Sequence, residues 1–98
     1  MITKEKILIT LKKNKANLSK FGVSSIGLFG SYFHGTQTRE SDIDLLIDLV
    51  PEKENFDNYM AVYDILERLF KNKKIDLVTK NGLSKYIGPA ILQNVTYV

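Results

Sequence analysis

Apolar and polar residues alternate along the segment from Asp42 to Leu49, and this pattern constrains the fold more than any other in the chain. Alternation with a period of two is typical of a β-strand that buries one face. Pro51 marks the end of the strand, because proline lacks the N–H that a sheet ladder needs. The expected buried face carries Ile43, Leu45, Ile47 and Leu49, and the opposite face carries Asp42, Asp44, Leu46 and Asp48.

The rest of the chain alternates between helical and extended patterns. Helices are expected over residues 4–20 and 55–71, strands over 23–29 and 74–79, and a helical turn over 31–35. A further helix is expected from about Leu83 until Gly88-Pro89 breaks it, and Pro89 is expected to begin a final helix before a tail or short edge segment at 97–98. This order predicts an α/β (α+β) fold, with a small mixed sheet of at least three strands flanked by helices, in a single domain spanning residues 1–98.

The positive charge is confined to one end of the chain. Residues 1–20 hold six lysines and one glutamate, a balance of +5, whereas the whole chain carries only +3, so the other residues sum to −2. A nucleic-acid groove usually combines basic and aromatic residues across a fold. Direct nucleic-acid binding is therefore not expected.

Missing residue types narrow the chemistry further. The absence of cysteine excludes a disulfide scaffold and a thiol nucleophile, and a single histidine argues against a structural zinc site. No apolar run approaches the ~20 residues of a membrane span, and the first residues do not resemble a signal peptide. The expected location is the cytoplasm, without a membrane partner.

Three aspartates carry the strongest chemical signal. Asp42 and Asp44 share one strand face with Cα atoms ~6.6–6.8 Å apart, and Asp76 occupies a polar position of the strand expected at 74–79. If these strands pair, the carboxylates converge, and each pair of charges 4–5 Å apart repels by roughly 3–4 kcal/mol. Two divalent cations would offset this repulsion, and oxygen ligands without histidine or cysteine favour Mg²⁺ or Mn²⁺ over zinc.

A Gly30-Ser31 pair lies between an expected strand and a helical turn. Glycine allows a phosphate to approach the backbone, and the N–H groups that follow point at it. The Ser31 hydroxyl can also donate to a phosphate oxygen. A phosphate site beside a two-metal carboxylate cluster is suited to in-line attack on a nucleotide phosphorus.

These residues together resemble the minimal nucleotidyltransferase (MNT) domains of the DNA polymerase β superfamily. The family signature is Gly-Ser, about ten residues, then Asp-x-Asp, with a third carboxylate in a later Val/Ile-Asp-Leu-Val string. The resemblance covers nearly the whole chain. It is carried by Gly27–Tyr32, Gly35, Ser41–Leu46, Ile75–Val78, Leu83–Ile87 and Ile91-Leu92.

The resemblance implies a role for each matching residue. Gly30 and Ser31 would hold the β- and γ-phosphates of ATP, and Asp42 and Asp44 would ligate both Mg²⁺ ions. Asp76 would ligate the catalytic ion and act as base toward an acceptor hydroxyl. Family members are commonly antitoxins paired with a HEPN-domain toxin, and several transfer AMP onto a tyrosine of that partner (AMPylation).

One departure from the family pattern leaves an alternative open. His34 stands where many members have arginine, so a permanent cation near phosphate becomes a titratable one. The alternative is therefore a catalytically weak or inactive antitoxin that neutralises its partner by binding alone. Because no second domain is expected to hold the acceptor, specificity has to come from a partner protein, through an exposed apolar patch, or from a homo-oligomer. Small-molecule nucleotidylation is disfavoured for the same reason.

Overall fold

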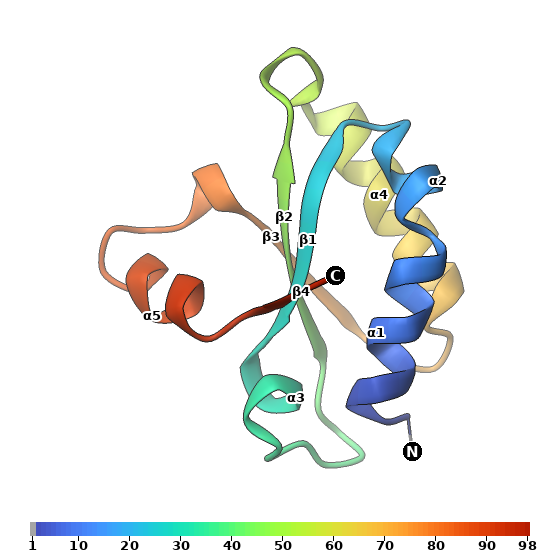
Figure 1. The fold of residues 1–98 in the computed structure, drawn as a ribbon, viewed down its shortest axis with the longest axis vertical. Coiled ribbons are helices and arrows are strands. Elements are labelled where there is room, and N and C mark those ends of the chain that lie inside the picture. Colours follow the sequence, from blue (N-terminus) through green and yellow to red (C-terminus); the bar gives the residue numbers. More distant parts are fainter. Residues whose placement is uncertain (1) are drawn as a thin grey trace.

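A four-stranded mixed sheet forms the centre of the molecule (Figure 1). The structure, a computed structural model, describes residues 2–98. The strand order is β3-β2-β1-β4; β1 pairs antiparallel with β2 and β4, whereas β2 and β3 are parallel. The strands are β1 (Val23–Phe29), β2 (Ile43–Leu49), β3 (Ile75–Thr79) and β4 (Thr96–Tyr97). The predicted mixed sheet is confirmed. The segment expected as a tail or short edge segment at the C-terminal end of the chain is a short edge strand.

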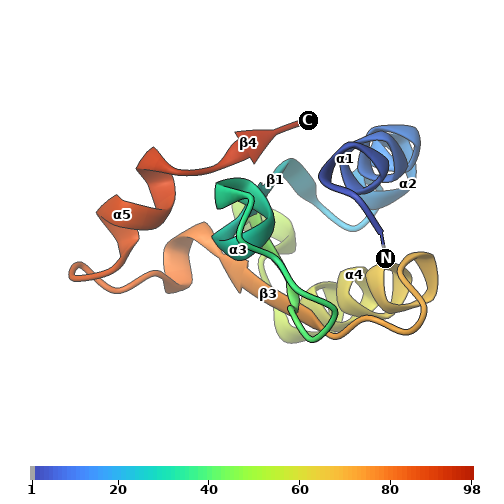
Figure 2. The ribbon, with the colours of Figure 1, turned by 90° about the horizontal axis from the view of Figure 1, so that it is seen from below.

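Three of the helices cover one face of the sheet, and α5 lies on the other side (Figure 2). The covering helices are α1 (Lys4–Lys13), α2 (Lys15–Ser19) and α4 (Phe56–Leu69). The remaining helices are α3 (Gly30–His34), η1 (Pro51–Lys53), η2 (Lys80–Gly82) and α5 (Gly88–Gln93). No helix among residues 2–98 is both long and apolar enough to span a bilayer.

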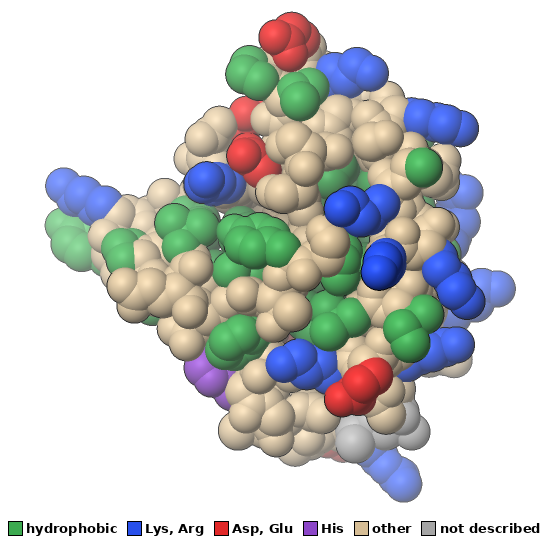
Figure 3. Space-filling model, viewed as in Figure 1, with side chains coloured by type: hydrophobic (Ala, Val, Ile, Leu, Met, Phe, Trp, Pro, Cys, Tyr) green, Lys and Arg blue, Asp and Glu red, His purple; other side chains and the backbone are tan. Residues whose placement is uncertain are grey.

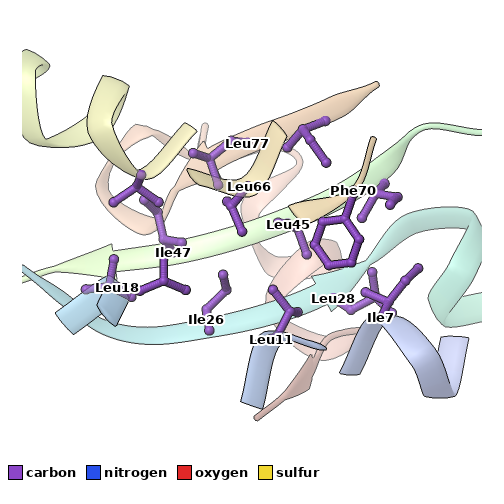
Figure 4. Packing of buried hydrophobic residues seen from close by; sticks show 14 of the residues in the cluster. Ile7, Leu11, Leu18, Ile26, Leu28, Leu45, Ile47, Leu66, Phe70 and Leu77 are labelled. Carbon is purple, nitrogen blue, oxygen red and sulfur yellow. The ribbon is translucent and has the colours of Figure 1, made fainter. Parts of the chain in front are cut away.

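Side chains from the helices and the sheet interlock in the covered layer (Figure 4). Ile7 and Leu11 of α1 and Leu66 of α4 are fully buried against strand residues such as Leu45 and Ile47. Thr3 caps α1 through its hydroxyl, and Asn55 caps α4 through its side-chain oxygen. The alternation predicted along β2 is confirmed, since all four of its expected core residues are buried.

The second face of the sheet is covered only in part. Residues 83–95, which we call the C-terminal arm, cross this side before β4 pairs with β1. A Cβ at Gly27 would collide with Val95, so this glycine allows the arm to approach the strand. Leu46 points away from the core layer, yet it is only 1% exposed.

Two helix predictions were wrong. The helix expected over residues 4–20 is divided at Asn14, whose side chain donates to the Thr10 carbonyl oxygen and competes with the helical pattern. The helix expected from Leu83 does not form. Thr79 instead caps the short turn of η2 by accepting from the Gly82 N–H, and Leu83 leaves it in an extended conformation.

Candidate functional site

The site lies where β2 and β3 begin, beside the start of α3. In the parallel pairing of these strands, Asp44 stands directly opposite Asp76, as Ile43 does opposite Ile75. The backbone bond from Ile43 N–H to the Lys74 carbonyl oxygen, 2.9 Å long, fixes this register. Residues opposite one another in a ladder project to the same side, so both carboxylates leave the sheet on the face that the helical layer does not cover.

Asp44 is the most strongly perturbed carboxyl group of the site. Burial raises its pKa to about 6, and a hydrogen bond with Asp76 and the charges of Asp76 and Asp42 add to the rise. The Ser31 backbone N–H donates to the Asp44 carboxylate and opposes it. Asp76 is exposed, whereas Asp42 and Asp44 are half-buried. The site therefore concentrates negative charge around one partly desolvated carboxylate.

Gly30 brings the start of α3 against this carboxylate. Its φ of +72° is in the left-handed region that favours glycine, and an added Cβ would overlap the Asp44 carboxylate. Ser31 follows on the first turn of α3, which ends at Gly35 with a φ of +75°. Strand β1, the tight turn and the acidic pair thus meet at one point.

The predicted site residues differ in how closely they come together. Asp44, Asp76, Gly30 and Ser31 are in contact through the interactions above, and Asp42, one residue before β2, is near enough for its charge to act on Asp44. Among residues 2–98, no three His, Cys, Asp or Glu side chains are grouped as ligands of one metal ion. His34 is exposed and packs edge-on against Phe33, with ring centroids 5.0 Å apart.

Tyr59 is a neighbour of the site that its sequence pattern did not identify. Its hydroxyl donates to the Leu77 carbonyl oxygen over 2.6 Å and so fastens α4 to the outer edge of β3. Burial raises the pKa of Tyr59, and the charge of Asp76 raises it further. Helical spacing marks Tyr59 as a core residue, and no local signal predicts a bond to a strand 18 residues away.

The similarity to known proteins agrees with this geometry. A model of the nucleotidyltransferase domain matches residues 10–98. The chain belongs to the nucleotidyltransferase domain family. It is 36% identical to the protein adenylyltransferase MntA of Thermococcus cleftensis, over 100% of this chain and 98% of that protein. It is also 37% identical, over 100% of both chains, to a Methanocaldococcus jannaschii protein that is assigned, though not established, as a protein adenylyltransferase.

Solved structures share the fold. One assigned as a minimal nucleotidyltransferase superposes with a TM-score of 0.83 at 20% identity, over 97% of this chain and 95% of the other. Another, of a toxin–antitoxin with AMP-PNP, gives 0.66 at 24% identity, over 98% of this chain and 72% of that one. The resemblance to minimal nucleotidyltransferases and the assignment to an enzyme family are thereby confirmed.

Proposed function

We propose that this chain transfers AMP from ATP to a hydroxyl group of a HEPN-domain toxin, a tyrosine hydroxyl in the first instance, and so acts as its antitoxin. The observation that carries the proposal is the placement of Asp44 opposite Asp76 with the Gly30-Ser31 turn against them. Acidic oxygens and a backbone turn suited to phosphate meet there within one small volume. These groups are suited to holding a triphosphate beside a proton acceptor.

The donor chemistry of the acidic group suits Mg²⁺. It offers carboxylate oxygens from Asp42, Asp44 and Asp76, with no imidazole or thiolate among them. In the absence of metal, Asp44 and Asp76 share a hydrogen bond, so a proton reduces their repulsion. Two Mg²⁺ ions held by these three residues would neutralise charge on the triphosphate and on the departing pyrophosphate.

The chain's own residues have separate tasks in the proposed reaction. Gly30 and Ser31 hold the β- and γ-phosphates, which orients the α-phosphorus toward the acceptor. Asp76, the exposed carboxylate, accepts the proton of the acceptor hydroxyl. The hydroxyl oxygen forms a bond to the α-phosphorus, the bond from that phosphorus to the bridging oxygen breaks, and pyrophosphate leaves with the electron pair.

The acceptor assignment is supported by relatives rather than by a feature of the site. A protein of similar length, 36% identical, is named a protein adenylyltransferase. Two solved structures with the same fold are a toxin–antitoxin with AMP-PNP and an MntA–HpeT toxin–antitoxin variant. A protein partner is thus the acceptor class we propose for this chain, in the cytoplasm.

The direct test follows label from ATP to the partner. The chain is incubated with Mg²⁺, ATP labelled at the α-phosphate, and a HEPN-domain protein as the proposed partner. We expect label on the partner with the wild-type chain and none with Asp42→Asn or Asp44→Asn. Equal labelling by wild type and both variants would reject the proposed site.

His34 favours a second candidate, an antitoxin that acts by binding alone. It is exposed at the end of α3, where a titratable ring replaces the family's permanent cation. This candidate predicts that the toxin is neutralised equally well by wild type, Asp42→Asn and Asp44→Asn. Toxin activity measured with each variant separates the two functions.

A further inference from the structure

A groove runs along the outer edge of β3, toward the end of that strand. Its volume is about 450 Å³. Three consecutive residues that follow Asp76, from Leu77 to Thr79, form one wall. The end of β2, the two residues before α4, the start of α4 and η2 supply the rest of what we call the β3-edge groove. Its lining residues, in addition to that wall, are Leu49, Glu54, Asn55, Phe56, Tyr59 and Gly82.

Tyr59 connects the groove to the site. The residue lines the groove, and its hydroxyl donates to the carbonyl oxygen of Leu77, the residue that follows Asp76 in β3. Burial raises the pKa of Tyr59, and the charge of Asp76 adds to the rise. The hydrogen bond leaves the Leu77 carbonyl oxygen occupied. A chain lying here could therefore not pair with the whole edge of β3 as an added strand, and the groove is better suited to side chains.

The groove is lined mainly by apolar residues and carries one carboxylate. Phe56 is 73% exposed, the highest value for any large apolar side chain of the helical layer. The only charged lining residue is Glu54. The charged residues next to the lining, Glu52, Lys53, Asp57 and Lys80, are exposed and of both signs, and the Lys53 ammonium donates to the Lys20 carbonyl oxygen. Acidic and basic side chains lie side by side at the end of the molecule formed by η1, whereas lysines dominate the side formed by α1 and α2 (Figure 3). The one charge in the lining of the groove is thus opposite in sign to the net charge of the chain.

We propose that the β3-edge groove docks a segment of the acceptor protein that carries apolar and basic side chains, and that this docking brings the acceptor hydroxyl to Asp76. The inference rests on the proposed function for the identity of the partner. Glu54 in the lining favours a basic side chain by charge complementarity, and the exposed ring of Phe56 supplies apolar contact area. Specificity for the acceptor thus comes from a surface of this domain.

The test compares two exposed aromatic residues on different parts of the surface. Phe56→Ser removes the most exposed apolar side chain of the groove lining. Tyr86→Ser is the matched control on the C-terminal arm, where Tyr86 is 83% exposed. Binding to the HEPN-domain protein is measured by calorimetry, and label transfer is measured as a function of its concentration. We expect Phe56→Ser to raise both Kd and the acceptor KM by at least about tenfold, with kcat and the Kd for Mg-ATP unchanged. Tyr86→Ser should match wild type.

A second variant tests the charge of Glu54 without disturbing the fold. Glu54 accepts a hydrogen bond from the Asn81 amide over 2.8 Å through one carboxylate oxygen, and Glu54→Gln keeps that acceptor while removing the charge. The affinity for the partner should fall a few-fold at low salt, and the difference from wild type should vanish at high salt. An equal effect at both salt concentrations would contradict the role of charge.

The outcomes separate this inference from the proposed function. If wild type binds the partner without labelling it, the enzymatic proposal fails, but the Kd values still test the groove. Loss of binding in Tyr86→Ser and not in Phe56→Ser would overturn the groove and assign docking to the arm. A weaker Kd for Mg-ATP in Phe56→Ser would assign the groove to the nucleotide, and loss of self-association would assign it to a second copy. A wild-type chain that neither binds nor labels the partner would overturn both proposals.

Discussion

The two faces of strand β2 have different environments although their residues alternate along seven positions. One face carries four side chains that are 0–4% exposed beneath the helical layer. The other carries Asp44, which is half-buried and faces Asp76, and Leu46, which lies outside the main core. The comparison separates two tasks, since one face stabilises the fold while the other holds charges that destabilise it and have a use only when a ligand neutralises them.

The largest expected effect comes from a substitution on the sheet face that carries the aspartates. Asp76→Asn should lower the rate of label transfer by about 1,000-fold, equivalent to about 4 kcal/mol of barrier, because it removes the proposed proton acceptor. Asp48→Asn is the matched control. Asp48 lies on the same face of β2 as Asp44, but it is opposite Ser25 at the far end of the strand. Initial rates are compared at saturating ATP. A similar loss in both variants would indicate a general effect of charge.

Truncating a core side chain tests the face of β2 that lies beneath the helical layer. Leu45→Ala should lower the free energy of unfolding by about 3 kcal/mol, because Leu45 is fully buried between the sheet and the helical layer. Leu46→Ala should lower it by only about 2 kcal/mol, because Leu46 lies outside the main core cluster, on the sheet face that the helical layer does not cover. Urea unfolding monitored by circular dichroism measures both. Equal losses would show that this second face is packed as firmly as the face beneath the helices.

Paired glycine substitutions separate the geometry of the site from backbone strain. Gly30 and Gly35 have φ values of +72° and +75°, so alanine is strained at either position. Only at Gly30 would the new Cβ collide with Asp44, because nothing lies within 4 Å at Gly35. Gly35→Ala should cost about 1 kcal/mol and Gly30→Ala about 2 kcal/mol with loss of label transfer. Thermal unfolding and transfer rates distinguish the two positions.

Local patterns in the chain predict the strands better than they predict the site. The alternation along β2 identifies its two faces, and the Gly-Ser and Asp-x-Asp spacing identifies the residues that gather near α3. The register that places Asp44 against Asp76 depends on how α4 returns the chain to the sheet, which no short window contains. The hydrogen bond of Tyr59 could not be predicted for the same reason, because its partner Leu77 belongs to another element.

The errors in helix prediction also have local causes. A continuous stripe of apolar residues predicts one helix over 4–20, but the Asn14 side chain satisfies a carbonyl within α1 and the helix divides. After β3, the pattern near Leu83 indicates a helix, but Thr79 and Gly82 close a short turn first. Side-chain bonds to the backbone changed the outcome at both places.

The smallest predicted effect concerns the stability of the metal-free protein. Because the folded state raises the pKa of Asp44 from 3.8 to about 6, the folded chain holds a proton that the unfolded chain releases in this range. Stability should therefore fall as the pH rises from about 4 to 6 and remain lower above it. Asp44→Asn removes this penalty, so its Tm in EDTA should exceed that of wild type by a few degrees at pH 7.5 and match it near pH 4. Asp48→Asn should show no such pH-dependent difference. A wild-type Tm at pH 7.5 equal to that of Asp44→Asn would mean that the acidic pair carries no repulsion for a cation to relieve.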